Sequence, residues 1–440
     1  MTKRKLPVAP ARKREAETER LAEMPLRATI DANELTAAIR DGLMAFCCSA
    51  GLLVVREMME AELTEKVGPK GRHDPDREAL RNGTAPGSVV LGGRKVPLRR
   101  PRAVKREGGE IALDSYGVFS TADLLSELAT ERMLAGVATR RHGLVSEPIG
   151  EDREADAFGD SRSSVSRRFV QATRAKVDEL VHRDLSGLEV AALMVDGIVF
   201  HDCCVVVALV ITTDGTKVPV GLWDGDTENT VVVRDLLADL VARGLRFEQG
   251  ILCVLDGGKA LSAGVKRVFG KHAVVQRCVL HKRRNLDDYL AKDLAKVTDR
   301  KIAKAFNDED AARGLRVARG IATSLEADHP SAAGSLREGL EEMFTLRRLG
   351  VPDLLCRSLS STNCIESMIS VSQDLSRRVK HWRDTTMVRR WVGAGMLEAE
   401  RSFRRVKGCK DMDILVKAVR AEVAKRVAAD EAEELDRAVA

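Results

Sequence analysis

The segment ILCVLDGGKALSAGVKRVFGKHAVVQRCVLH, residues 251–281, contains the pattern that decides the fold. Its apolar runs at 251–255 and 272–279 are short and rich in β-branched residues, as buried strands are. The run at 259–269 between them has helical spacing and ends at Gly270. Three more apolar runs precede it at 190–195, 203–212 and 217–222, followed by a helical pattern at about 228–243. The predicted order is therefore β-β-β-α-β-α-β, which indicates an α/β fold.

This order is that of a ribonuclease-H-like catalytic core, and the segment that follows interrupts it. Residues 283–360 have amphipathic helical patterns without strand signals, which predicts an all-helical insertion. A helix at 363–379 comes next, with Glu366 at the edge of its apolar stripe. We expect a disordered tail at 1–25, a helical and basic DNA-binding region at 26–115, a helix-turn-helix-like region at 116–184, the first part of the core at 185–282, the insertion at 283–360, the last core helices at 361–400 and a helical tail at 401–440.

Three acidic residues are the candidate catalytic groups. Asp196 and Asp256 each follow a predicted strand and precede a glycine, so the sheet would hold each carboxylate rigidly at a solvent-facing strand end. Together with Glu366 they suit a site for two Mg²⁺ ions acting on phosphodiesters, where Mn²⁺ can substitute. The alternative for each aspartate is a simple Asp-Gly turn, and for Glu366 it is a capping box with Asn363.

Positive charge is concentrated in the first quarter of the chain. Residues 1–110 contain 22 Lys and Arg against 16 Asp and Glu, whereas residues 111–440 contain 50 of each. The run RKVPLRRPRAVKR at 94–106 has seven basic residues and no acidic one, which suits DNA phosphates, although a solvated basic loop has the same composition. The candidate DNA contacts are Arg94, Lys95, Arg99, Arg100 and Arg102 in this run, Ser166, Arg167 and Arg168 at the start of a helix, and Arg377, Arg378, Trp382 and Arg383, where the tryptophan either stacks on a base or packs into a neighbouring segment.

The remaining patterns concern the N-terminal region and the compartment. Helices are predicted at 31–66, 122–142 and 162–182, a loop at 67–88, and a hairpin with Gly92-Gly93 as its turn. No stretch approaches 18 uncharged apolar residues, so no membrane span is expected. The basic N-terminus has no apolar run, so we predict no secretory signal. Nine scattered cysteines predict no disulfide framework and favour a reducing cytoplasm.

Two blocks are the most specific patterns in the chain, QRCVLHKRRNL at 276–286 and STNCIES at 361–367. With VDG at 195–197, TEN at 227–229, VARGL at 241–245 and LDGGKAL at 255–261, they resemble the insertion-sequence transposases of the IS256 family, relatives of the Mutator transposases, from about residue 35 to about residue 405. The tryptophan expected soon after Glu228 is absent, and Val232 and Val233 lie there. The residues that support the match are Gln276, Arg277, Cys278, Arg284, Asn285 and Asn363.

The resemblance implies a DDE transposase that binds terminal inverted repeats and cleaves and joins DNA strands. It implies that Asp196, Asp256 and Glu366 bind the metals, and that His281 positions the scissile phosphate or assists proton transfer. It also implies double-stranded repeat and target DNA as partners, a dimer on DNA, and a place in the bacterial cytoplasm with the nucleoid. Cys278 and His281 have ligand-like spacing, but a structural zinc needs four ligands and the sequence offers no second pair. A domesticated, non-catalytic DNA-binding protein and a ribonuclease-H-like nuclease or resolvase are the alternatives.

Overall fold

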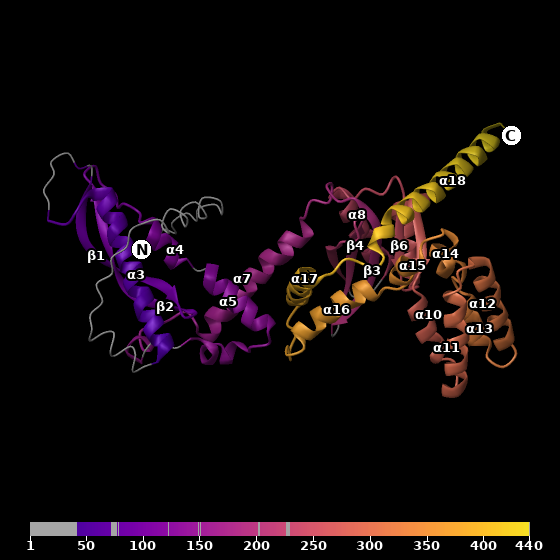
Figure 1. Cartoon of the computed structure of the whole chain (residues 1–440), viewed down its shortest axis with the longest axis horizontal. Helices are drawn as coiled ribbons and strands as arrows, with labels where there is room; N and C mark the ends of the chain where they lie inside the picture. Colours follow the sequence, from indigo (N-terminus) through magenta and orange to yellow (C-terminus); the bar gives the residue numbers. More distant parts are fainter. Residues whose placement is uncertain are drawn as a thin grey trace. The chain divides into compact units, whose positions relative to one another are not determined.

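The computed structural model describes residues 42–71, 77, 79–121, 123–147, 149, 151–200, 203–225 and 229–439. The chain forms two compact units, residues 1–172 and 173–440 (Figure 1). The tail predicted at 1–25, the start of the helix predicted at 31–66 and most of the TEN motif lie outside the described residues. The finer domain boundaries drawn from the sequence stay predictions.

The first unit is built on a long helix packed against an antiparallel hairpin. Met59 of the helix and Val89 of the hairpin are fully buried in one shared core. The predicted turn is confirmed, since Gly92 and Gly93 have φ of 57° and 76°, a conformation that suits glycine. The elements are α3 (Leu43–Val67), β1 (Ala79–Leu91), β2 (Arg94–Lys105), α4 (Asp114–Ser120), α5 (Asp123–Leu134), η1 (Thr139–Arg141), η2 (Gly143–Val145), α6 (Glu151–Glu154) and α7 (Arg162–Val181), which runs into the second unit.

Two sequence predictions for this unit are wrong in extent. The loop predicted at 67–88 contains the first part of β1, because pairing with β2 continues past a register shift between Arg81 and Thr84. Such long-range pairing leaves no clear alternation in a segment rich in glycine and proline. The helix predicted at 122–142 ends at Leu134, because Gly136 adopts φ 86° and closes the helix there.

A five-stranded mixed sheet forms the centre of the second unit. Its strand order is β5-β4-β3-β6-β7, in which β3, β4 and β5 pair antiparallel while β6 and β7 run parallel to β3. The predicted α/β class is therefore confirmed, and each predicted strand and helix between residues 190 and 279 is present. Their bounds are β3 (Val190–Phe200), β4 (Cys203–Thr212), β5 (Lys217–Gly225), α8 (Thr230–Ala242), β6 (Ile251–Leu255), α9 (Lys259–Phe269), η3 (Gly270–His272) and β7 (Ala273–Arg277).

Helices cover both faces of this sheet, because successive side chains of a strand point to opposite faces. Leu193 and Val195 of β3 lie in a core with α8 and α9. Ala192 and Met194 lie in a second core with the C-terminal helices. Those helices are α16 (Asn363–Ser376), α17 (Thr385–Ser402) and, after η5 (Cys409–Asp411), α18 (Met412–Val439), which Figure 1 shows in orange to yellow. The helix predicted at 363–379 thus ends three residues early, at Ser376.

A group of helices lies between β7 and α16 in the sequence, and residues 283–360 are helical as the pattern predicts. Residues 286–344 of this group share a core of their own, which includes Ile302, Ala318 and Leu336, whereas Leu346 and Leu355 lie in the core shared with the sheet. The elements are α10 (Val279–Asp287), α11 (Lys292–Phe306), α12 (Ala311–Leu325), α13 (Pro330–Arg337), η4 (Glu341–Phe344), α14 (Thr345–Arg348) and α15 (Asp353–Leu359). None of the helices that the structure describes combines the length and apolarity that a membrane span requires.

Candidate active site

Asp196 and Asp256 occupy matching positions on neighbouring parallel strands. The last pair in register between β3 and β6 is Val195 with Leu255, and each aspartate is the next residue in the sequence. Asp256 follows the end of β6 as predicted, whereas Asp196 lies inside β3, which continues to Phe200. The prediction that Asp196 ends its strand is therefore wrong. β3 continues because residues 196–200 still pair with β4 on its other side.

The two aspartates meet in a largely enclosed place. Asp196 is 8% exposed, and its Oδ1 accepts a hydrogen bond from the amide of Gly197 at 2.9 Å. Burial and the neighbouring charge of Asp256, with a smaller contribution from Glu366, raise the pKa of Asp196 to about 7 although His281 opposes the shift. Asp256 Oδ1 accepts from the amide of Gly258 at 2.7 Å, which holds the loop after β6. A carboxyl in such surroundings favours either a proton or a nearby cation.

Glu366, in the first turn of α16, is the third acidic side chain of the cluster. Its Oε1 accepts a hydrogen bond from the Thr362 hydroxyl at 2.9 Å and lies 3.8 Å from His281 Nδ1. Its Oε2 lies 3.4 Å from Arg284 Nη1. The capping-box alternative does not hold, because Thr362 occupies the N-cap position and Asn363 is the first helical residue, with no side-chain capping bond. The Glu366 carboxylate therefore faces side chains from α10.

Thr362 is the residue of the candidate site that sequence reasoning missed. Its side chain is fully buried, and its hydroxyl oxygen lies 3.2 Å from His281 Nδ1 and 3.3 Å from Cys278 Sγ, besides its bond to Glu366. The only available signal was its place in the STNCIES block, directly before Asn363. Thr362 therefore links the two specific sequence blocks through one hydroxyl group.

Cys278 and His281 are brought together at the start of α10. Cys278 is the N-cap residue, and its Sγ accepts hydrogen bonds from the backbone amides of His281 at 3.5 Å and Thr362 at 3.4 Å. Burial would raise the pKa of the Cys278 thiol, but its bonds to His281 and Thr362 hold it below the ordinary value. The same contact with Cys278, opposed by burial and aided by Glu366 and Asp256, raises the pKa of His281 to about 9.

Gln276 and Arg277, which precede Cys278 in the QRCVLHKRRNL block, support this arrangement through hydrogen bonds to the backbone. Gln276 is fully buried and donates to the carbonyl of Met343 at 2.9 Å while accepting from the amide of Leu346 at 3.0 Å, so it ties β7 to the helical group. Arg277 donates to the carbonyl of Gly257 at 2.7 Å and so supports the loop that carries Asp256. Asn285 and Asn363 are exposed.

The family described as "Transposase, Mutator family" matches residues 27–406. The chain belongs to the Mutator family of transposases. This confirms the family predicted from the QRC and STN blocks.

Three relatives have printed names that agree with this family. The chain is 27% identical over 235 residues to the transposase for insertion sequence element IS6120 of Mycolicibacterium smegmatis, across 51% of this chain and 71% of the relative. It is 28% identical over 181 residues to the transposase for element IST2 of Acidithiobacillus ferrooxidans, across 40% and 59%. It is 25% identical over 336 residues to the transposase for element IS905 of Lactococcus lactis, across 74% and 81%. The IST2 match thus spans less than two thirds of that relative.

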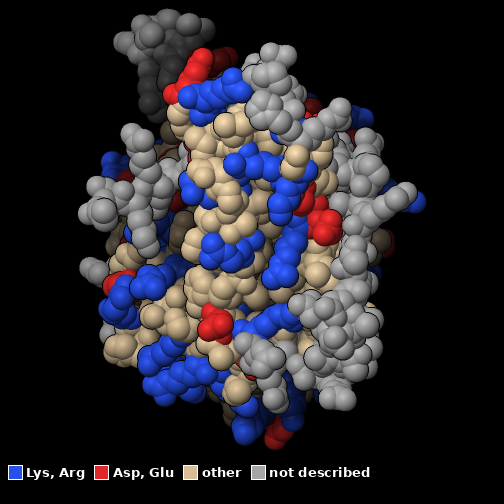
Figure 2. All heavy atoms as spheres, turned by 90° about the vertical axis from the view of Figure 1, so that its left-hand side faces the viewer, with Lys and Arg blue, Asp and Glu red and all other residues tan. Residues whose placement is uncertain are grey.

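In this Mutator-family chain the predicted DNA contacts of the hairpin lie on β2. Figure 2, which views the protein from the side of β1 and β2 in Figure 1, shows Lys and Arg widely spread over that face with few acidic residues. Arg94, however, has a side chain that is 11% exposed and pairs with Glu154 and Asp160 at 3.4 and 3.5 Å. Internal pairing leaves Arg94 poorly placed to contact DNA.

The next hairpin residues are more open. Arg99 is exposed and donates to the Thr84 hydroxyl at 2.9 Å, while Lys95 is half-buried. Arg100 and Arg102 share the carboxylate of Glu110 at 2.7 and 3.0 Å, and their two positive charges exceed its single negative charge. The solvated-loop alternative does not hold for 94–105, because these residues form a strand.

The other two groups of predicted DNA contacts lie on helices or just after them. Ser166 and Arg167 are exposed on α7, whereas Arg168 is half-buried and donates to the carbonyl of Gly159. Arg377 and Arg378 are exposed after α16, and Arg383 pairs with Asp384 at 2.9 Å. The Trp382 ring lies 5.3 Å from the Phe200 ring at an interplanar angle of 60°, which agrees with the packing alternative for this tryptophan.

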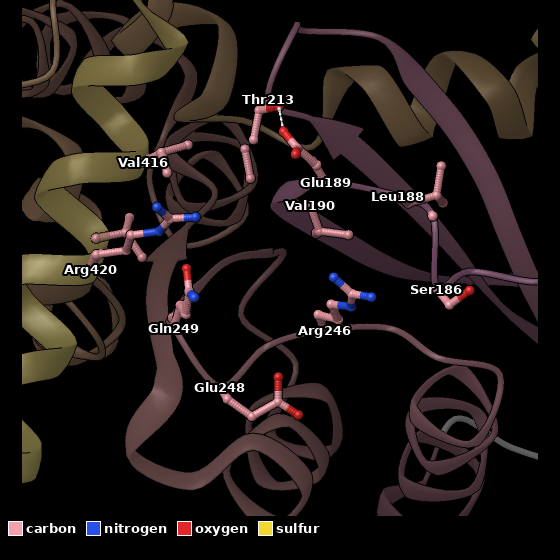
Figure 3. Close-up of a pocket in the computed structure, with 14 residues that line it drawn as sticks. Ser186, Leu188, Glu189, Val190, Thr213, Arg246, Glu248, Gln249, Val416 and Arg420 are labelled. Atoms are coloured by element: carbon pink, nitrogen blue, oxygen red, sulfur yellow. Dashed lines mark hydrogen bonds between the residues drawn. The ribbon is translucent and has the colours of Figure 1, made fainter.

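A separate cavity of about 550 Å³ lies at the other end of the parallel strands (Figure 3). It includes Val190, where β3 begins, and Gly250, directly before β6, so it does not contain the acidic cluster. Arg246 and Arg420 lie on different sides of it, and Thr213 donates to Glu189 at its rim at 3.1 Å. Its mixed charges select no single class of ligand.

Proposed function

We propose that this protein is a DDE transposase that binds the terminal inverted repeats of its own element, cleaves the DNA strands there and joins them to target DNA. What carries the proposal is that Asp196 and Asp256 directly follow Val195 and Leu255, which pair on neighbouring parallel strands. The charges of Asp256 and Glu366 both act on Asp196, since each raises the pKa of Asp196. Membership of the Mutator transposase family supports the same function.

We further propose that the second unit is a ribonuclease-H-like core interrupted by a helical insertion. Three antiparallel strands followed by two parallel ones, with helices on both faces, support this assignment. The helices α10 to α15 come between β7 and α16, and those from α10 to η4 have a separate core. Such an insertion would bring Cys278 and His281 at its first helix beside Glu366 at its end, which agrees with the observed contacts.

The acidic cluster fits Mg²⁺ or Mn²⁺, which take oxygen ligands. Asp196, Asp256 and Glu366 would hold the ions, whose positive charge would offset the burial and the repulsion from Asp256 that raise the pKa of Asp196. Two bound divalent ions would make a water or 3′-hydroxyl more nucleophilic and stabilise the leaving oxygen. His281, with a pKa of about 9, is an imidazolium at neutral pH and is suited to donate a hydrogen bond to a phosphate oxygen.

The remaining residues would hold the DNA. Arg99, Arg100 and Arg102 on β2, with Arg167 on α7, place exposed or half-exposed positive charge within the first unit, where phosphate contacts would give salt-dependent binding. We propose that this unit recognises the inverted repeats, that the protein acts on DNA as a dimer, and that it works with the nucleoid in the bacterial cytoplasm.

The test uses the full-length protein and a DNA fragment with the inverted repeats that flank its gene. Asp256→Asn and Glu366→Gln should bind this fragment as the wild type does in a mobility-shift assay, but their strand cleavage in Mg²⁺ should fall by several orders of magnitude. A Glu366→Gln protein that cleaves at the wild-type rate would refute the site. Cleavage without joining to target DNA would favour the nuclease or resolvase alternative.

A further inference from the structure

Cys278, His281 and Glu366 bring three different metal-binding atoms together. The thiol sulfur, an imidazole nitrogen and a carboxylate oxygen all lie within 4.8 Å of one another. In the part of the chain that the structure describes, this is the one such group of cysteine, histidine and acidic side chains. The sequence contains the Cys-x-x-His pair, and the fold adds a third donor, Glu366, which comes after the helical group in the sequence.

This set of donors suits a different metal from the acidic cluster. Thiolate and imidazole select borderline-soft cations such as Zn²⁺, whereas Mg²⁺ prefers oxygen ligands alone. Three protein ligands with one position left for water are the usual arrangement of an open zinc site. We propose that Cys278, His281 and Glu366 form a second metal site, which binds Zn²⁺ or another thiophilic divalent cation and inhibits strand cleavage by doing so.

The contacts around the three donors fit a bound cation. Two backbone amides point at Cys278 Sγ, from His281 and Thr362, and stabilise a thiolate there. The Thr362 hydroxyl lies between the donors, 2.9 Å from Glu366 Oε1, 3.2 Å from His281 Nδ1 and 3.3 Å from Cys278 Sγ, so it orients all three.

Solvent access and the local charge also allow a cation to bind at this site. The Cys278 thiol is buried, but the His281 and Glu366 side chains are each 27% exposed, so a cation can enter from their side. Arg284 opposes a cation, but its nearest contact is with Glu366 Oε2 at 3.4 Å, whereas Oε1 faces the thiol and the imidazole. Asp256, whose charge also acts on His281, adds negative charge nearby.

Inhibition follows because Glu366 belongs to both sites. A carboxylate that binds Zn²⁺ beside Cys278 and His281 is withdrawn from Mg²⁺ beside Asp196 and Asp256. This consequence rests on the proposed transposase function, whereas metal binding itself does not. Saturating Zn²⁺ should therefore abolish Mg²⁺-dependent cleavage while DNA binding continues.

Cobalt absorption tests binding without reference to catalysis. The full-length protein, reduced with a phosphine, is titrated with Co²⁺, which replaces Zn²⁺ and gives an intense thiolate-to-metal band when a cysteine coordinates it. We expect this band in the wild type at one Co²⁺ per chain. The Cys47→Ser protein should keep it, because Cys47 is the exposed thiol most open to adventitious binding, and Cys278→Ser should lose it.

A second variant keeps the test decisive if Cys278→Ser fails to fold. Glu366→Gln leaves the thiol and imidazole in place, and it should weaken Co²⁺ binding by more than the roughly 10–100-fold that loss of an outer-shell partner causes. No thiolate band in the wild type, or a band that depends on Cys47 instead of Cys278, would overturn the site. A normal thiolate band together with full cleavage at saturating Zn²⁺ would overturn the proposal that the metal inhibits cleavage. Near-wild-type cleavage by Asp256→Asn would instead show that the proposed transposase function is wrong.

Discussion

Replacing Asp196 with Asn should stabilise the metal-free protein while it destroys catalysis. Asp196 is 8% exposed, and burial with the adjacent Asp256 raises its pKa from 3.8 to about 7. Because the folded pKa is above the unfolded one, the folded state binds more protons, and stability falls as the pH rises from about 4 through about 7. A shift of about three pKa units corresponds to about 4 kcal/mol of lost stability above pH 7.

Asparagine removes that penalty because it carries no charge. Its amide oxygen can still accept the hydrogen bond that Gly197 donates to Asp196 Oδ1 at 2.9 Å. At pH 8 in EDTA we therefore expect Asp196→Asn to be more stable than the wild type by up to about 4 kcal/mol. At pH 5 the wild-type carboxyl is protonated in the folded protein, so most of the difference should disappear.

Urea unfolding followed by tryptophan fluorescence measures this difference for the second unit, which also contains Asp196. The three tryptophans, Trp223, Trp382 and Trp391, all lie in residues 173–440. Asp328→Asn is the matched control, since Asp328 is exposed in the same unit and its replacement should change little. Mg²⁺ at about 100 times its dissociation constant should stabilise the wild type by about 2.7 kcal/mol, and Asp196→Asn by less. An Asp196→Asn protein less stable than the wild type at pH 8 in EDTA would refute the reasoning.

Three further predictions concern other buried groups. Thr362→Val removes the hydroxyl that orients Glu366, so single-turnover cleavage should fall about 10–100-fold while Thr362→Ser largely restores it, and equal rates for Val and wild type would show no positioning role. Gln276→Leu leaves the Met343 carbonyl and the Leu346 amide buried without their partner, and the second unit should lose about 2–6 kcal/mol in urea unfolding; a loss below 1 kcal/mol would mean that the neighbours rearrange. Burial alone would raise the pKa of Glu62, but bonds from Lys66, Ser115 and two backbone amides hold that pKa below its usual 4.5. The first unit should therefore lose stability as the pH falls from 4.5 through that lowered value. Acid unfolding followed by circular dichroism should show less of this dependence in Glu62→Gln, and identical acid profiles would contradict it.

The sequence predicted the second unit well because its signals are local. Short β-branched runs and helical spacing are properties of neighbouring residues, and each strand and helix predicted between residues 190 and 279 is present. The hairpin turn at Gly92-Gly93 was predictable for the same reason, since only the turn residues decide its conformation. The first part of β1 was not, because residues 79–88 are extended through pairing with β2 and not through a pattern of their own.

For the candidate site, the sequence by itself determined which acidic residues stand out and that Cys278 and His281 lie at one junction. Only the tertiary structure decided that β3 continues past Asp196, that Arg94 is enclosed by Glu154 and Asp160, and that the Thr362 hydroxyl connects Glu366 with the Cys-x-x-His pair. The physical reason is distance along the chain. Side chains some 80 residues apart meet through strand register and helix packing, which depend on the whole core and leave no mark on local spacing.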